Sequence, residues 1–399
     1  MKYTQLKEKI VNTNSINTHS HHLGDAFFKK FDLDTLLARS YVDWCGVKFS
    51  EDYDSRKNYI DKVKFKSYFV YLQKAIKKIY HIDADLSADT WSIYSDTIKE
   101  AHEKDGDWHK KILREKCKYE KILLDAYWNP GADNGDPSLF SPVFRINPLF
   151  FGYSKEASDH NEHNVFELYD ESFESLEGFL DFVQIKIKEK ISQGCVALKI
   201  PIAYDRDLDF KNTSSRKASR VFMQSENHPD DIVNFQDYLA FQVCEIASSL
   251  DIPVQIHTGM GCMNKTAPRY LLKLIEENPK TQFVLFHAGF PWTEDIIGMM
   301  HLFPNVYADL CWLPLLSPTE AKNTLHQLIE IGTSDKITWG GDAWTSEESC
   351  GARLAIDDVL HLVLSEKIDS GYLSTFGAEE IVDNILHNNA KSLYSNLLL

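Results

Sequence analysis

Several features are missing from this sequence, and each absence excludes a class of protein. The 399 residues include seven cysteines but no Cys-X-X-Cys pair, and an odd number of cysteines argues against a closed disulfide framework. No apolar run approaches the roughly 20 residues that a membrane-spanning helix needs. The opening segment MKYTQLKEKIVN is charged and lacks the apolar centre of a signal peptide. We therefore expect a cytoplasmic protein.

Positive charge is also scarce. Lys plus Arg number 43 against 59 Asp plus Glu, which gives a formal net charge of −16. An acidic surface repels phosphate backbones and anionic lipid head groups, so neither nucleic acid nor a membrane is an expected partner. Hydrophobic residues make up 43% of the chain, which is typical of a soluble folded protein. A small molecule is the expected ligand, and assembly into a homo-oligomer is compatible with this composition.

The sequence does contain a regular alternation of strand-like and helix-like segments from about residue 190 onward. The helical pattern is clearest from Ile232 to Leu250, where apolar residues recur at steps of three and four. The strand-like runs are apolar and end at Gly, Asp or Pro, as parallel strands buried on both faces do. Together with three earlier runs they number eight: 15–19, 119–128, 141–150, 195–202, 251–259, 281–289, 305–312 and 336–344. This alternation predicts a (β/α)8 TIM barrel, as one domain spanning residues 1–399.

Residues 25–118 interrupt this rhythm. They are aromatic and helix-forming, where a barrel has a single helix between its first two strands. We interpret the segment as a helical insertion after the first strand, with its Lys and Arg on solvated helix faces. The insertion is expected to cover the barrel mouth or to form a subunit contact.

The ends of the predicted strands carry side chains that bind metals or activate substrates. Because the carboxyl ends of barrel strands meet at one mouth, we expect these side chains to converge. Taken singly, each has a structural alternative, such as a hydrogen-bonded histidine or a helix-capping aspartate. Their coincidence at strand ends predicts a metal site formed by His19, His21, Lys199, His257, His287 and Asp342.

These motifs resemble a known family. The order His-X-His, Lys, His, His, Asp on strands one, four, five, six and eight is similar to that of the amidohydrolase superfamily of metal-dependent barrel hydrolases. The segments THSHH, IHTGMG, FHAGFPW and GGDAW resemble especially its amidohydrolase-2 branch. The long helical insertion is similar to that of the uronate isomerases of the same superfamily.

Imidazoles and a carboxylate suit Zn²⁺ with an open position for water, and Mn²⁺ or Fe²⁺ is compatible. Such a metal lowers the pKa of its bound water. Asp342 is then the candidate base that accepts the water proton and later protonates the leaving group. His287 would polarise the scissile carbonyl. The resemblance implies the same roles.

The number of metal ions stays open at this point. In a one-metal site His19, His21, His257 and Asp342 would hold the ion, leaving His287 free for catalysis. In a two-metal site a carboxylated Lys199 would bridge the ions and His257 with His287 would hold the second, as the resemblance to binuclear members of the superfamily implies.

Fewer residues indicate the substrate. Arg145 lies near the end of a predicted strand and Arg206 follows the next one, so either could bind a carboxylate, and Arg353 could face the same site. Tyr204 and Trp312 could line an apolar pocket. We expect a hydrolase that acts on the carbonyl group of a small amide, ester or lactone. The substrate could also carry a carboxylate. The alternatives are isomerisation of a sugar acid, decarboxylation, or a degenerate barrel that serves as a binding scaffold.

Overall fold

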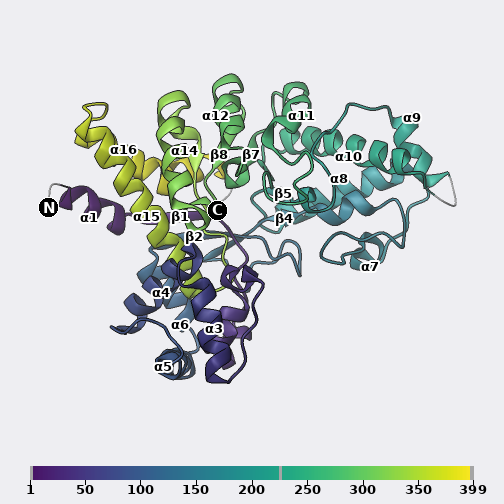
Figure 1. The fold of residues 1–399 in the computed structure, drawn as a ribbon. Helices are drawn as coiled ribbons and strands as arrows, with labels where there is room; N and C mark the ends of the chain where they lie inside the picture. The colour runs from purple at the N-terminus through teal and green to yellow at the C-terminus, as the bar shows by residue number, and fades with distance from the viewer. Residues whose placement is uncertain (1–2, 224–226, 396–399) are drawn as a thin grey trace.

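The computed structural model describes residues 3–223 and 227–395, and its centre is a set of short parallel strands surrounded by helices (Figure 1). The strands form two hydrogen-bonded sheets in the orders β1-β2-β3 and β4-β5-β6-β7-β8-β9. Their bounds are β1 Ser15–Ser20, β2 Tyr119–Leu124, β3 Phe140–Pro142, β4 Phe144–Arg145, β5 Leu198–Ile200, β6 Val254–Ile256, β7 Phe283–Leu285, β8 Val306–Asp309 and β9 Ile337–Thr338. Every pairing between neighbouring strands is parallel.

Backbone hydrogen bonds continue the ring across both junctions between the two sheets. Only Val143 separates β3 from β4, and its N–H donates to the carbonyl of Leu124 at 2.9 Å. At the other junction the N–H of Thr18 in β1 donates to the carbonyl of Trp339, one residue past β9, at 3.2 Å. With β3 and β4 counted as one interrupted strand, the eight predicted strands are present in order, and the predicted TIM-barrel fold class is confirmed.

The helices outside the insertion surround the strands, with α12 and α14 on one side of the barrel and α8 and α10 on another (Figure 1). In the described part of the chain no helix is both long and apolar enough to cross a bilayer. The helices are α1 Thr4–Asn12, α7 Val165–Tyr169, α8 Leu176–Ser192, α9 Ser215–Ala218, α10 Pro229–Ser249, α11 Leu272–Glu277, α12 Thr293–Leu302, α13 Leu313–Leu316, α14 Pro318–Ile331, α15 Ser346–Asp369, α16 Thr375–Asp383 and α17 Asn389–Leu393.

All predicted strands except the first are shorter than expected, and one of them continues as a helical turn. Residues 147–150 of the predicted strand 141–150 belong instead to the 3-10 turn Asn147–Phe151, with Pro148 in its first turn. Proline lacks a backbone N–H and fixes φ near −65°, which suits a helical turn and removes one ladder hydrogen bond. The turn directs the chain away from the barrel directly after Arg145.

The insertion between β1 and β2 is helical, as predicted, and forms a lobe of its own (purple to blue in Figure 1). Its buried apolar residues make a separate cluster that includes Tyr59, Trp91 and Tyr94. The helices of this lobe are α2 Leu33–Ala38, α3 Tyr53–Val63, α4 Ser67–Tyr80, α5 Trp91–Lys104 and α6 Trp108–Lys111. The lobe therefore has a hydrophobic core of its own, separate from that of the barrel.

Two buried glutamates in the first turn of α15 attach the insertion to the barrel. Glu347 accepts a hydrogen bond from the hydroxyl of Tyr80 at 2.5 Å and contacts Nε2 of His102 at 2.9 Å. Glu348 accepts hydrogen bonds from the backbone N–H of Tyr41 at 2.9 Å and of Trp344 at 3.1 Å. Glu348 therefore joins the insertion to the loop that follows β9.

This buried carboxyl predicts a pH-dependent stability. Burial raises the pKa of Glu348 to about 8, whereas an unfolded glutamate titrates near about 4.3. The folded state binds the proton of Glu348 more tightly than the unfolded state does. Protonation of Glu348 therefore stabilises the fold fully below the unfolded pKa, and this stabilisation is lost as the pH rises through about 8. Relative to Glu348→Gln, the native chain should lose a few kcal/mol of unfolding free energy across this window, measured by chemical denaturation.

The matched control is Glu103→Gln, because Glu103 is exposed on α5. This variant should follow the pH dependence of the native chain. If Glu348→Gln also followed it, Glu348 would not be the group that titrates.

Candidate metal centre

The pairing of β1 with the segment after β9 gathers the first three candidate ligands. The N–H of Asp342 donates to the carbonyl of His19 at 2.8 Å, and the N–H of His21 donates to the carbonyl of Ala343 at 2.9 Å. Gly340 permits this approach, since a Cβ there would lie 2.7 Å from the backbone nitrogen of His19. The His-X-His pair and the GGD motif are therefore brought together by backbone geometry.

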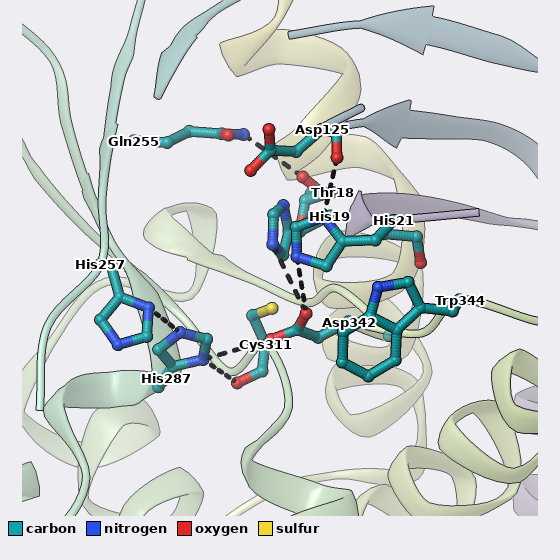
Figure 2. A network of polar contacts seen from close by, with 12 residues as sticks. Thr18, His19, His21, Asp125, Gln255, His257, His287, Cys311, Asp342 and Trp344 are labelled. Atoms are coloured by element: carbon teal, nitrogen blue, oxygen red, sulfur yellow. Dashed lines mark hydrogen bonds and ion pairs between the residues drawn. The ribbon is translucent and has the colours of Figure 1, made fainter. Parts of the chain in front are cut away.

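Three donor atoms of this group face one another. Nε2 of His19 lies 3.5 Å and Nε2 of His21 lies 3.4 Å from the same oxygen, Oδ1 of Asp342 (Figure 2). Asp342 is buried, and this oxygen has no hydrogen-bond partner among the described residues. A buried carboxylate oxygen without a donor is costly unless a cation or a proton satisfies it. The donor set and its orientation therefore fit a divalent metal ion.

The pKa shifts of Asp342 and His19 favour the protonation states that metal binding requires. Burial raises the pKa of Asp342, but the adjacent His19 and His21 outweigh that effect and hold the pKa well below its ordinary value. Burial lowers the pKa of His19 well below its ordinary value. A carboxylate facing a neutral imidazole is the protonation pattern of a metal ligand pair.

His257 and His287 form a second pair, at the ends of β6 and β7. Nδ1 of His257 lies 2.9 Å from Nε2 of His287 (Figure 2). The other nitrogen of each ring contacts a backbone carbonyl, of Met260 for His257 and of Cys311 for His287. A carbonyl only accepts, so those outer nitrogens carry the hydrogens of the neutral rings. The two inner nitrogens then face each other with lone pairs.

Two facing lone pairs at this distance repel unless a proton or a cation satisfies them. Burial lowers the pKa of His287 to about 4 and that of His257 well below its usual value, which disfavours the proton. The arrangement therefore suits two imidazoles that share a bound cation. It pairs His257 with His287, as the two-metal alternative requires.

Lys199, at the centre of β5, lines one cavity together with His19, His21, His257 and Asp342. Its Nζ is buried, has no hydrogen-bond partner among the described residues, and lies 3.4 Å from the centre of the Phe286 ring. Burial lowers the pKa of Lys199 to about 8. A larger fraction of this amine is therefore neutral near neutral pH than for an exposed lysine, and only the neutral amine can react with CO₂.

The backbone at the strand ends is strained. His287 has φ of 62°, Trp312 of 66° and Asp342 of 52°, all in the left-handed region that non-glycine residues rarely adopt. Each such residue costs roughly 1–3 kcal/mol, and such strain concentrates at functional sites. Two of these three residues, His287 after β7 and Asp342 after β9, are candidate ligands.

All candidate ligands except His287 line a cavity of about 220 Å³. On its wall Nη1 of Arg145 donates to Asp125 at 2.7 Å, and Nη2 lies 3.0 Å from Nε2 of His160. His160 is held in turn by Asp205, whose Oδ2 lies 2.8 Å from Nδ1. These two contacts use one N–H each of Nη1 and Nη2, and each of these groups carries a second N–H with which the guanidinium can donate to a ligand. Tyr204 also lines the cavity.

Other residues suggested by the sequence lie elsewhere. Arg206 pairs with Asp237 of α10 at 3.0 Å and does not line the cavity. Trp312 is buried behind it, with its ring centre 5.3 Å from that of His287. Arg353 does not face the site, because it lies at the opposite end of β1 and hydrogen-bonds Ser15. Helix periodicity alone did not indicate which end of the barrel Arg353 would reach.

Sequence reasoning missed several residues of the site. Asp125 directly follows β2, and one carboxylate oxygen lies within 4.8 Å of ligand atoms of His19 and His21. The position of Asp125 after an apolar strand is the same signal that indicated Asp342. Residues of long loops and of the insertion had no such signal, yet they line the cavity; they are Tyr41, Trp44, His160 and Asn161.

Comparisons with known proteins agree with this geometry. The amidohydrolase family model matches residues 220–395. Protein fluG of Emericella nidulans is 26% identical over 384 residues, a match that covers 91% of this chain and 40% of that protein. The chain thus spans less than half the length of that relative.

Three crystal structures share the fold over nearly the whole chain. Uronate isomerase from Thermotoga maritima superposes with a TM-score of 0.74 at 16% identity, covering 98% of this chain and 96% of that one. Glucuronate isomerase from Caulobacter crescentus gives 0.76 at 14% identity, with 98% and 93% covered. A protein provisionally described as a metal-dependent hydrolase from Lactobacillus casei gives 0.73 at 16% identity, with 99% of each chain covered. The amidohydrolase family model thus matches the C-terminal part of this chain, and the chain shares its fold with these three structures.

Proposed function

We propose that the protein is a divalent-metal-dependent hydrolase that acts on a small carbonyl compound carrying a carboxylate. The observation that carries this proposal is the unpartnered Oδ1 of Asp342, faced by Nε2 of both His19 and His21. The match of the amidohydrolase family model to residues 220–395 supports it. Zn²⁺ is the ion that this donor set suits best.

When bound, the metal would supply Lewis-acid activation of water and of the substrate carbonyl. His19 and His21 would hold it with neutral nitrogens, and the contact between His257 and His287 supports a second pair of ligands. The ionised Asp342 carboxylate would accept a proton from the attacking water and pass it to the leaving group. If Lys199 is carboxylated, its carbamate would lie between the two groups.

Arg145 would bind the substrate carboxylate. Its guanidinium is held from two sides, by Asp125 and His160, so its orientation is fixed before a ligand enters. Carboxylates are bound well by such an oriented fork of N–H groups. The cavity of about 220 Å³ limits the substrate to a small molecule.

A second candidate is the isomerisation of a sugar acid. The similar structures include two uronate isomerases, and in this chain Tyr41 and Trp44 of the insertion close one side of the cavity. The same metal and the same Arg145 would serve a hexuronate. This reaction would move protons within the substrate and consume no water.

The test begins with metal analysis of the purified full chain, expressed in metal-supplemented medium. We expect at least one equivalent of zinc, manganese or iron, and a carbon-13 carbamate signal if Lys199 is carboxylated. The protein is then assayed on a panel of small amides, esters and lactones with and without a carboxylate, and on hexuronates.

The outcomes separate the candidates. Water-consuming turnover that is lost with a chelator and restored by Zn²⁺ supports the hydrolase. Interconversion of hexuronates without hydrolysis supports the isomerase. Less than a stoichiometric amount of any metal, with no turnover, would contradict both and favour a binding scaffold.

A further inference from the structure

Cys311 lies between the two groups of candidate ligands, a position that the strand-end pattern did not indicate. It follows β8 by two residues and is fully buried. Its carbonyl oxygen lies 3.1 Å from Nδ1 of His287. Its sulfur lies within 4.8 Å of ligand atoms of both His19 and Asp342 (Figure 2). One residue therefore contacts the first group through its side chain and the second through its backbone.

The backbone of Cys311 is fixed by neighbouring strands. Its N–H donates to Oδ1 of Asp309 at 2.8 Å. The other oxygen of Asp309 accepts hydrogen bonds from the hydroxyls of Thr18 in β1 at 2.6 Å and of Thr338 in β9 at 2.7 Å. These are the strands that carry His19 and lead to Asp342. Hydrogen bonds between the barrel strands thus fix the position of the Cys311 thiol relative to His19 and Asp342.

Packing alone would also explain a buried cysteine, since free cysteines behave as small apolar residues. The surroundings of Cys311 are different. The sulfur faces a carboxylate whose Oδ1 has no hydrogen-bond donor in the described ranges, and Nε2 of His19 lies 3.5 Å from that oxygen. An imidazole nitrogen, a carboxylate oxygen and a sulfur that lie within 4.8 Å of one another are a donor set for Zn²⁺.

We propose that Cys311 is a thiolate ligand of the metal that His19 and Asp342 hold. This inference rests on the proposed metal dependence and extends it to the choice of metal. On binding, the S–H bond breaks, the proton passes to solvent, and the sulfur electron pair forms the bond to the metal, with no change in oxidation state. A soft sulfur ligand favours Zn²⁺ or Co²⁺ over Mn²⁺ and Mg²⁺.

Co²⁺ binding to the metal-free full chain tests this without a substrate. A thiolate ligand adds a sulfur-to-cobalt charge-transfer band in the near ultraviolet, in addition to the visible bands that any Co²⁺ site shows. We expect the band in the native chain and its loss in Cys311→Ser. Affinity for Zn²⁺ should fall by at least about tenfold in that variant. Cys262→Ser is the matched control, because Cys262 is exposed, and it should keep the band.

The outcomes distinguish this inference from the proposed function. Visible Co²⁺ bands in the native chain without the charge-transfer band would overturn the thiolate ligand and leave metal dependence standing. No Co²⁺ or Zn²⁺ binding at all would overturn both. If Cys311→Ser fails to fold, X-ray absorption at the cobalt edge of Cys262→Ser decides the question, because a sulfur neighbour must still be present there.

Discussion

Replacement of Asp342 by asparagine is expected to lower turnover by about a hundredfold to ten-thousandfold, the usual contribution of a positioned general base. The change keeps the shape of the side chain but removes the charge and the proton-accepting oxygen that His19 and His21 face. Asparagine tolerates the left-handed backbone at this position, where φ is 52°. The measurement is kcat on whichever substrate the panel identifies, together with metal content.

Asp251→Asn is a closely matched control for that experiment. Asp251 has φ of 50°, so the same substitution is made at the same backbone conformation, but its side chain is exposed and outside the cavity. Its turnover should equal that of the native chain. Retained activity in Asp342→Asn with metal still bound would show that another group accepts the proton.

The barrel fold could be predicted from the sequence, and so could the convergence of the side chains at the ends of its strands. Strand ends are predictable because apolar runs mark the strands and parallel strands end at one face. The hydrogen bonds between β1 and the segment after β9 show why His19 and Asp342, far apart in sequence, meet. The predicted roles of these residues remain proposals.

What the sequence did not indicate depends on long-range contacts. Tyr41 and Trp44 reach the cavity because Glu348, in α15, binds the backbone of Tyr41 and fixes the insertion over the barrel mouth. His160 reaches Arg145 because Asp205, beyond the next strand, holds its ring. Neither contact leaves a periodic pattern in the chain, since each joins a loop to a distant element.

Arg353 illustrates the same limit, and it carries the largest expected effect on stability. Its guanidinium donates five hydrogen bonds, which accounts for all five N–H groups of an arginine. The acceptors join the end of α1, the start of β1, the segment before β2 and α15; they are Asp357 Oδ1 at 2.7 Å, Ser15 Oγ at 2.8 Å, and the carbonyls of Cys117 at 3.0 Å, Ile10 at 2.7 Å and Thr13 at 3.1 Å.

We therefore expect Arg353→Met to lower the free energy of unfolding by about 3–5 kcal/mol, because it leaves the buried Asp357 and several carbonyls without a donor. Chemical denaturation measures this loss. Arg269→Met is the control, since the exposed Arg269 pairs with Asp295 and its loss should lower the free energy of unfolding far less. Because Arg353 lies at the end of β1 away from His19, metal binding by the folded variant should be unchanged. Equal losses in the two variants would mean that the buried network adds no more than a surface ion pair.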